Sequence, residues 1–216
     1  MKLTNTKYIP DDQIELPFWE SGLLVAGVDE AGRGALAGPV VAASVIFPMG
    51  MNNDLGCRDS NLMTANDRES LFEHILVNAL EVGIGIVEED IVDSINVRNA
   101  TLVAMQESLS CLQAINLHAL IDGNFFKHDT LPFTTMIKGD YHCFSIAAAS
   151  IVAKVTRDRI MQELDGKVNS LYYFAQNKGY GTAIHREAIV KHGPSTYHRR
   201  TFLGKIDRKS TRLNSS

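Results

Sequence analysis

The stretch that most constrains the fold is residues 23–47, LLVAGVDEAGRGALAGPVVAASVIF, in which two apolar runs flank a short polar segment. The first run, residues 23–28, is typical of a strand buried on both faces, and Asp29 and Glu30 follow it directly. Adjacent carboxylates beside a buried strand are costly unless a cation binds them, so we expect a divalent metal here. The second run, residues 40–47, continues as a strand, which predicts a β-loop-β hairpin.

Glycines shape the polar segment. Gly32 and Gly34 bracket Arg33, so the backbone can turn sharply and approach a ligand while one guanidinium reaches for an anion. The spacing excludes a dinucleotide-binding loop, because Gly38 comes one place too late and a strand, not a helix, follows Pro39. For the two acids alone, an acidic β-turn without a metal is the alternative interpretation.

Two more carboxylates occupy similar places. Asp122 follows the strand predicted over residues 117–121, and Asp140 follows the strand predicted over residues 133–137, just before a helix over residues 144–164. Four gathered carboxylates repel one another unless divalent cations neutralise them, and hard oxygen ligands suit Mg²⁺ or Mn²⁺. Two such ions about 3.5–4 Å apart would form a site for phosphoryl displacement.

Length and composition describe an ordinary globular chain. The 216 residues suit one domain, and 45% hydrophobic and 21% charged residues are typical of a soluble protein. No apolar run reaches the ~20 residues of a membrane span, and the N-terminus lacks a signal peptide core, so we expect a cytoplasmic protein. The cysteines Cys57, Cys111 and Cys143 are odd in number and far apart, which predicts reduced thiols.

Charge is unevenly distributed along the chain. Residues 1–133 carry 7 Lys and Arg against 19 Asp and Glu, whereas residues 134–206 carry 11 against 5. A basic C-terminal third can bind a polyanion while the acids hold metal, although the net charge is −4. Asymmetry along the sequence does not by itself establish a basic patch in space.

Local signals predict several helices. Thr64, with Asp67 three places on, resembles a capping box, and Thr182 is a good N-cap for a helix over residues 183–192. Apolar spacing predicts another helix over residues 96–114. In the long helix from Phe144, Lys154 and Asp158 have the spacing of an i,i+4 surface pair.

Seven motifs, in this order, resemble the bacterial ribonuclease HII family, also called type 2 ribonuclease H. They are DEAGRG (29–34), LAGPVVAA, IDGN (121–124), KGD (138–140), SIAAASIVAKVTRD, NKGYGT and HRRTF. The similarity runs from about Gly22 to Phe202. It implies a catalytic domain over residues 22–206. Residues 1–21 form a polar lead-in before it, in which we expect Pro17 to Trp19 to fold back onto the body.

The resemblance implies an α/β protein with an RNase H-like fold, a central mixed β-sheet flanked by helices. It also implies that Asp29, Glu30, Asp122 and Asp140 are catalytic and ligate two Mn²⁺ or Mg²⁺ ions. The family cleaves the RNA strand of RNA–DNA hybrids and nicks duplex DNA 5′ of an embedded ribonucleotide, leaving 5′-phosphate and 3′-hydroxyl ends. We therefore expect a monomeric endoribonuclease, with no membrane partner, that serves ribonucleotide removal in DNA repair and replication.

The same resemblance assigns substrate contacts. Gly32, Arg33 and Gly34 match the loop that senses the ribose 2′-hydroxyl, and Tyr180 matches the tyrosine that stacks at the RNA–DNA junction. Without the family, a packing role for Tyr180 is the simpler interpretation. Asn61 stands where lysine is usual in the family. Further candidate contacts to the substrate backbone are Ser60 and six basic residues, each of the six with solvated surface charge as the alternative: Lys154, Arg157, Lys178, His185, His198 and Arg199.

The last ten residues, 207–216, read DRKSTRLNSS and do not resemble the family. They match the translation of a common sequencing-adapter read, which predicts a chimeric or truncated gene assembly. On this hypothesis the native sequence stops near Ile206, and the adapter-derived codons are absent from the source locus.

Three other functions compete with the nuclease interpretation. A catalytically silent hybrid-binding module is disfavoured because all four acids are present. A different RNase H-like nuclease, such as a junction resolvase, is disfavoured by the Gly-Arg-Gly loop together with Tyr180. A nucleotide-dependent enzyme is the weakest alternative, because the sequence contains no phosphate-binding loop.

Overall fold

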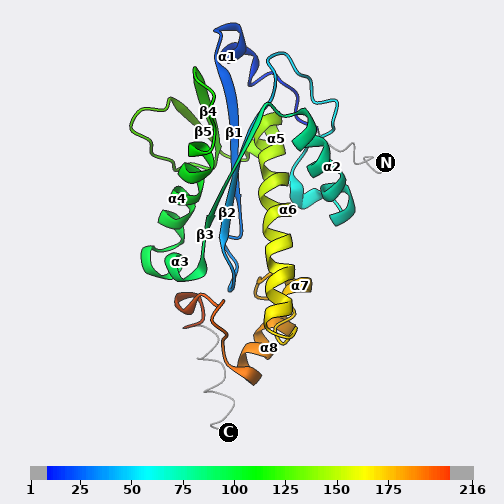
Figure 1. Cartoon of the computed structure of the whole chain (residues 1–216), viewed down its shortest axis with the longest axis vertical. Helices are drawn as coiled ribbons and strands as arrows, with labels where there is room; N and C mark the ends of the chain where they lie inside the picture. Colours follow the sequence, from blue (N-terminus) through cyan, green and yellow to red (C-terminus); the bar gives the residue numbers. More distant parts are fainter. Residues whose placement is uncertain (1–8, 205–216) are drawn as a thin grey trace, which may run out of the picture.

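A computed structural model describes residues 9–204 of the chain; residues 1–8 and 205–216, and with them the expected non-native tail, lie outside the described residues. The chain builds an α/β layer structure in which helices cover both faces of one sheet (Figure 1). Within the described part of the chain, no helix is long and apolar enough to cross a membrane.

The sheet has five strands in the order β3-β2-β1-β4-β5. The strands are β1 (Leu24–Ala31), β2 (Val40–Ile46), β3 (Glu81–Val87), β4 (Leu117–Asp122) and β5 (Phe133–Met136). β2 is antiparallel to both of its neighbours, β1 and β3, whereas β1, β4 and β5 run parallel to one another. The predicted hairpin and the mixed sheet are both confirmed, and every residue of β2 is buried, as expected of a central apolar strand.

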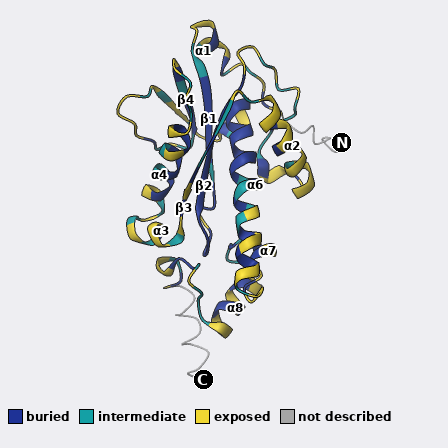
Figure 2. Ribbon diagram, in the orientation of Figure 1, coloured by how far each residue is buried: buried dark blue, intermediate teal, exposed yellow. Residues whose placement is uncertain are grey.

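Helices of very different lengths connect and cover the strands. The helices are α1 (Leu16–Glu20), α2 (Ala65–Asn78), α3 (Glu89–Ile95), α4 (Val97–Ser110), α5 (Gly139–His142), α6 (Phe144–Lys167), α7 (Phe174–Asn177) and α8 (Ala183–His192), with short 3-10 turns η1 (Ser60–Leu62) and η2 (Arg200–Phe202). α6 and α2 lie on one face of the sheet and α4 on the other, and the buried side of α6 faces the strands (Figure 2). The α7–α8 region extends beyond the sheet around the C-terminal half of α6 (Figure 1).

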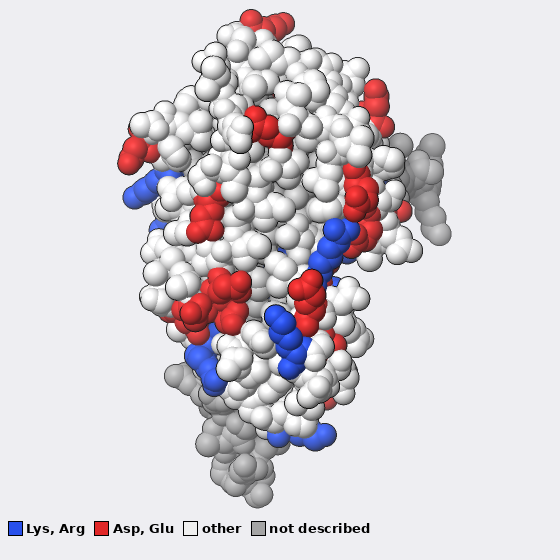
Figure 3. Space-filling view, viewed as in Figure 1, with Lys and Arg blue, Asp and Glu red and all other residues white. Residues whose placement is uncertain are grey.

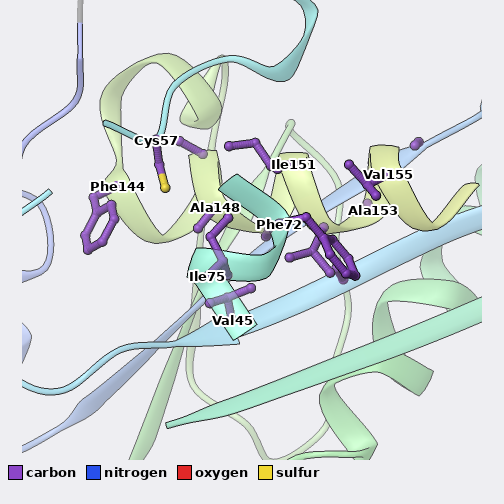
Figure 4. Packing of buried hydrophobic residues seen from close by; sticks show 14 of the residues in the cluster. Val45, Cys57, Phe72, Ile75, Phe144, Ala148, Ile151, Ala153 and Val155 are labelled. Atoms are coloured by element: carbon purple, nitrogen blue, oxygen red, sulfur yellow. The ribbon is translucent and has the colours of Figure 1, made fainter. Parts of the chain in front are cut away.

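One apolar core joins the sheet, α6 and α2. Val45 of β2 and Phe72 and Ile75 of α2 pack with Ala148 and Ile151 of α6, so α6 lies between the sheet and α2 (Figure 4). Thr64 caps α2 as predicted by accepting a hydrogen bond from the Asp67 amide. Burial of this apolar surface from three elements fixes α6 against the sheet.

Glycine allows α6 to approach β1 closely. A Cβ atom on Gly27 would lie 2.0 Å from the carbonyl carbon of Ser145, at the start of α6. On the opposite face, a Cβ on Gly83 or Gly85 of β3 would meet backbone oxygens of α4 at 1.9 and 2.0 Å. These strands can therefore carry no side chain at those positions while the helices stay where they are.

The N-terminal segment folds back onto the body, as predicted. Trp19 is buried and packs in a small cluster with Val25 and Ile146. Glu15, which the sequence did not single out, is fully buried, and its Oε1 atom accepts hydrogen bonds from the amide and hydroxyl of Ser145 and from the Cys143 thiol. The lead-in is thus anchored at the start of α6.

Two local expectations differ from the structure. The helix predicted over residues 96–114 ends earlier, at Ser110. It begins at Val97 because Asn96 has a φ of 65° and caps α4 with its side chain. Lys154 and Asp158 do pair, at 2.5 Å, but both side chains are about 15% exposed and so lie largely within the protein. Cys57, Cys111 and Cys143 are free thiols, as expected.

Candidate active site

Three acids converge where β1 and β4 run side by side. The parallel register pairs Val28 with Ile121. Asp29 and Asp122 are the next residues on these two strands and therefore lie on neighbouring strands at the same level. One carboxylate oxygen from each of Asp29, Glu30 and Asp122 lies within 4.8 Å of the others. The sequence predicted that these acids would gather, and the structure places the three of them in one group.

Asp140 reaches the same place from α5. The Gly139 amide donates a 2.7 Å hydrogen bond to Oδ1 of Asp122, which sets the first turn of α5 against the end of β4. A Cβ atom on Gly139 would lie 2.5 Å from the Cδ1 atom of Ile146, so a larger residue there would have to displace the end of that side chain. Asp140 lines a hollow of about 260 Å³ together with the three acids, but its oxygens are not part of their group.

Burial raises the pKa of all four carboxyls, and the charge of neighbouring acids adds to this effect for Asp29, Glu30 and Asp140. Burial raises the pKa of Asp29 well above its usual range, and the nearby charges of Glu30 and Asp122 raise it further. Burial also raises the pKa of Glu30 and of Asp122. For Asp140, burial together with the charge of Asp59 raises the pKa to about 6. The site therefore favours any cation that replaces bound protons.

Asp59 is a fifth carboxylate, which the sequence analysis did not assign to the site. Its side chain hydrogen-bonds to that of Asp140 and also caps the short η1 turn by accepting from the Asn61 amide. Asp59-Ser60 matches an Asp-Ser-Lys segment of the family, but of these two residues only Ser60 was predicted to contact substrate, because an acid in a polar connection carries no periodic signal. Asp59 thus adds negative charge on the Asp140 side of the hollow.

The donor set fits a hard divalent cation. Among residues 9–204 the only ion pair made by these acids joins Glu30 to Arg33, at 3.0 Å, so Asp29 and Asp122 form no ion pair there. Oxygen-only ligands of this charge suit Mg²⁺ or Mn²⁺. Arg33, expected to reach an anion, is held by Glu30 here and is half-exposed.

Gly32 and Gly34, which flank Arg33, differ in how strongly the fold requires glycine. Gly32 has a φ of +95°, and a Cβ atom there would lie 2.0 Å from Nε of Arg157. Gly34 has no atom within 4 Å of such a Cβ. The fold therefore requires Gly32, whereas at Gly34 the structure leaves open space beside the acids.

Arg157 and Arg199 are not free to contact a substrate backbone, contrary to expectation. Both are fully buried. Arg157 donates to the carbonyls of Ala37, Pro39 and Lys178, and Arg199 donates to those of Gly32, Arg33, Ala35 and Gly38. Each guanidinium has five N–H donors, and both guanidiniums donate to backbone carbonyls of residues 32–39. The two arginines therefore hold this loop in place.

His198 and His185 also lie inside, so the expectation of a backbone contact is wrong for them too. His198 is 2% exposed and His185 is fully buried. His185 Nδ1 lies 2.9 Å from the Tyr180 carbonyl oxygen, and its Nε2 lies 3.0 Å from Nε2 of His198. Desolvation lowers the pKa of His198 to about 4. The pair supports the loop that carries Tyr180.

Of the remaining candidates, Tyr180, Ser60 and Lys154 line the hollow and Lys178 does not. Tyr180 is half-buried, and its ring lies 5.8 Å from Nζ of Lys154 and 5.3 Å from the guanidinium carbon of Arg157. Ser60 is buried and accepts a hydrogen bond from the Ser150 hydroxyl. Lys178 does not line the hollow, and its carbonyl accepts from Arg157.

The basic C-terminal third does not form one basic face in the view drawn. On the face shown in Figure 3, lysine and arginine side chains lie singly or in small groups beside acidic ones. Part of the basic excess in the sequence is accounted for by the burial of Arg157 and Arg199. The asymmetry along the chain therefore does not appear as a basic patch on this face.

Comparison with solved structures defines the class of protein. Ribonuclease H2 from Pyrococcus horikoshii OT3 superposes with a TM-score of 0.72 over 90% of this chain and all of that chain, at 24% identity. Bst-RNase HIII, solved in complex with Mn²⁺, gives a TM-score of 0.69 over 89% of this chain and 70% of that chain, at 18% identity. The mixed sheet and its flanking helices are therefore those of an RNase H-like α/β fold, as predicted.

Sequence comparison gives the family. The profile of the family described as Ribonuclease HII matches residues 26–205. The Ribonuclease HII of Geotalea daltonii is 49% identical over 180 residues, which cover 83% of this chain and 82% of that protein. The chain belongs to the ribonuclease HII family and is a ribonuclease.

Proposed function

We propose that this protein is an endoribonuclease that hydrolyses the RNA strand of RNA–DNA hybrids and nicks duplex DNA 5′ of an embedded ribonucleotide. The products are 5′-phosphate and 3′-hydroxyl ends, as needed for ribonucleotide removal in DNA repair and replication. One observation carries the proposal: the group formed by Asp29, Glu30 and Asp122 shares a hollow with the Gly32–Gly34 loop. Family membership and the RNase H-like fold support it.

The acids are proposed as metal ligands. Asp29, Glu30, Asp122 and Asp140 would hold two Mg²⁺ or Mn²⁺ ions, which when bound supply an activated water and stabilise charge on the leaving 3′ oxygen. The raised pKa values of these carboxyls fit this role, because a site that resists negative charge when empty gains most from a cation. Gly139 links the end of β4 to α5 and so keeps Asp122 beside Asp140.

The loop is proposed to select the cleavage position. A single ribonucleotide in DNA differs from its neighbours by the 2′-hydroxyl, so its recognition requires close approach of hydrogen-bonding backbone groups. The open space at Gly34 allows that approach, and Arg33 would exchange Glu30 for a phosphate oxygen. Tyr180, backed by Lys154 and Arg157, presents an aromatic surface on the other side of the hollow.

The test uses a DNA duplex with one ribonucleotide, an RNA–DNA hybrid and an all-DNA duplex, each with Mg²⁺ or Mn²⁺. Wild type should nick the ribonucleotide-containing duplex on the 5′ side of the ribonucleotide and should cut the RNA strand of the hybrid. It should leave the all-DNA duplex intact. Asp122→Asn should lose cleavage, whereas Glu73→Gln, an exposed acid on α2, should keep it. Absence of the nick in wild type, or full cleavage by Asp122→Asn, would overturn the proposal.

A further inference from the structure

A second hollow adjoins the acidic one. Its volume is about 120 Å³, and it shares Glu30, Arg33 and Asp122 with the larger hollow. Its other walls come from the first two turns of α4 and from the connection after β4, with Arg98, Thr101, Asn124 and Phe125. The side chain of Arg33 therefore lies between two cavities, and a strand bound across the acids can continue into the second one.

Thr101 brings a polar atom to this hollow that the fold does not use. The residue is 7% exposed, and its hydroxyl oxygen has no hydrogen-bond partner among residues 9–204. Threonine side chains in helices usually bond to a backbone carbonyl of the preceding turn, and buried hydroxyls without partners are rare. An unpaired hydroxyl in the wall of a cavity next to a reaction centre indicates a ligand that pairs with it.

Arg98 brings a free cation to the same hollow. Its guanidinium carbon lies 3.7 Å from the ring centroid of Phe125, which is half-buried. This cation–π contact restrains the Arg98 side chain beside the hollow. No carboxylate within residues 9–204 forms an ion pair with Arg98. A preformed, unpaired guanidinium is suited to a phosphate group.

We propose that this second hollow binds a backbone phosphate of the cleaved strand, next to the phosphate that is hydrolysed. Arg98 supplies the charged donors and Thr101 a neutral hydroxyl donor, while Phe125 holds Arg98 in place. A charged fork with a hydroxyl favours a phosphate over a base edge, so the contact adds affinity without sequence preference. This inference rests on the proposed function, because it takes the acids as the site of hydrolysis.

The experiment pairs protein variants with substrates that lack one charge. A ribonucleotide-containing duplex is made with a neutral methylphosphonate at each phosphate flanking the cleavage site in turn. At one position the neutral group should lower kcat/KM of wild type about tenfold and leave Arg98→Gln unaffected, because the two changes remove the same contact. On the unmodified duplex Arg98→Gln should raise KM and make the salt dependence shallower by about one charge.

Two further variants make the result specific. Arg159→Gln removes one arginine charge from α6, where the side chain pairs with Glu69 and Glu73, and should behave as wild type. Thr101→Val should lower kcat/KM about threefold without lowering Tm, because the hydroxyl has no partner in the fold.

The outcomes separate the two proposals. If wild type fails to cut any ribonucleotide-containing duplex, the proposed function is wrong. If wild type cuts but Arg98→Gln shows the wild-type salt dependence and responds to every methylphosphonate as wild type does, the phosphate site alone is wrong. A lowered Tm for Thr101→Val would assign the hydroxyl a structural role and remove it from the site.

Discussion

The imidazole rings of His185 and His198 meet through their Nε2 atoms at 3.0 Å. His198 Nδ1 accepts from the Ser195 amide, so its Nε2 carries the proton and donates to His185. His185 in turn donates from Nδ1 to the Tyr180 carbonyl. Hydrogen bonding thus assigns both rings as neutral and joins the C-terminal segment to the loop that carries Tyr180.

This pair predicts loss of stability in mild acid. Desolvation, with smaller effects from His185 and Arg200, lowers the pKa of His198 from 6.5 to about 4 in the folded protein. The unfolded chain therefore binds a proton more readily, so the contribution is complete above pH 6.5 and is lost as the pH falls towards 4. The free energy of unfolding should fall by about 2 kcal/mol from this group between pH 7 and pH 5.

Urea unfolding of wild type and His198→Gln at both pH values checks this effect. Glutamine can donate to His185 and accept from Ser195 but does not titrate, so the variant should lose less stability on acidification. Equal losses in the two proteins would show that His198 does not titrate in this range.

Asp29→Asn should stabilise the metal-free protein while it abolishes cleavage. Burial and like charges raise the pKa of Asp29 well above its usual range, so its charge opposes folding at neutral pH. Asparagine keeps the oxygen that accepts from the Glu30 amide. Each kcal/mol relieved raises Tm by about 2–4 °C in a protein of this size. Thermal unfolding with and without Mn²⁺ measures both this rise and the metal-induced stabilisation, which the variant should lose.

Gly32→Ala and Gly34→Ala should separate folding from recognition. A methyl group at Gly32 meets Arg157 at 2.0 Å and needs a φ of +95°, so this variant should lose about 2–3 kcal/mol of stability as well as activity. At Gly34 a methyl group contacts nothing, so Tm should stay unchanged while cleavage at a single ribonucleotide falls. Denaturation and cleavage rates of both variants decide the matter, and full activity of Gly34→Ala would remove the loop from recognition.

Arg199→Lys should be far from conservative. Lysine cannot reproduce the fork that bonds to four loop carbonyls, so buried acceptors are left unpaired and stability should fall by about 3 kcal/mol. Cleavage should also weaken, because residues 32–39 lose their support. Arg200→Lys, at the exposed neighbouring position, is the matched control and should leave urea unfolding and cleavage unchanged.

Local patterns were enough to predict the two strands that hold Asp29, Glu30 and Asp122, but not the short helix α5 that holds Asp140. Apolar runs ending in carboxylates predicted β1 and β4, and the Thr64 and Thr182 caps predicted the starts of α2 and α8. The meeting of Asp29 with Asp122 follows from parallel pairing, which the order of elements favours. The site could therefore be predicted as far as it depends on neighbouring strands.

The roles of the basic residues could not be predicted from the sequence. Arg157 and Arg199 look like surface cations, because charged residues are seldom fully buried. Most of their partners are backbone carbonyls of residues 32–39, which lie 118 to 167 positions away, and a backbone carbonyl is not visible in a pattern of residue types. Asp59 was overlooked for a similar reason, since its neighbour Asp140 is distant in the sequence and lies on a separate turn.

The attachment of Arg199 to the loop after β1 has a consequence for synthesis of the protein. Gly32 and Gly38 leave the ribosome more than 160 residues ahead of the arginine that binds their carbonyls. Until that arginine arrives, the loop lacks four of its hydrogen-bonded anchors, even if β1 and β2 have already paired. The loop that we propose selects the cleavage position is thus synthesised early but is held in its final conformation only after Arg199 has been made. Asp29, Glu30, Asp122 and Asp140 are all synthesised before that point.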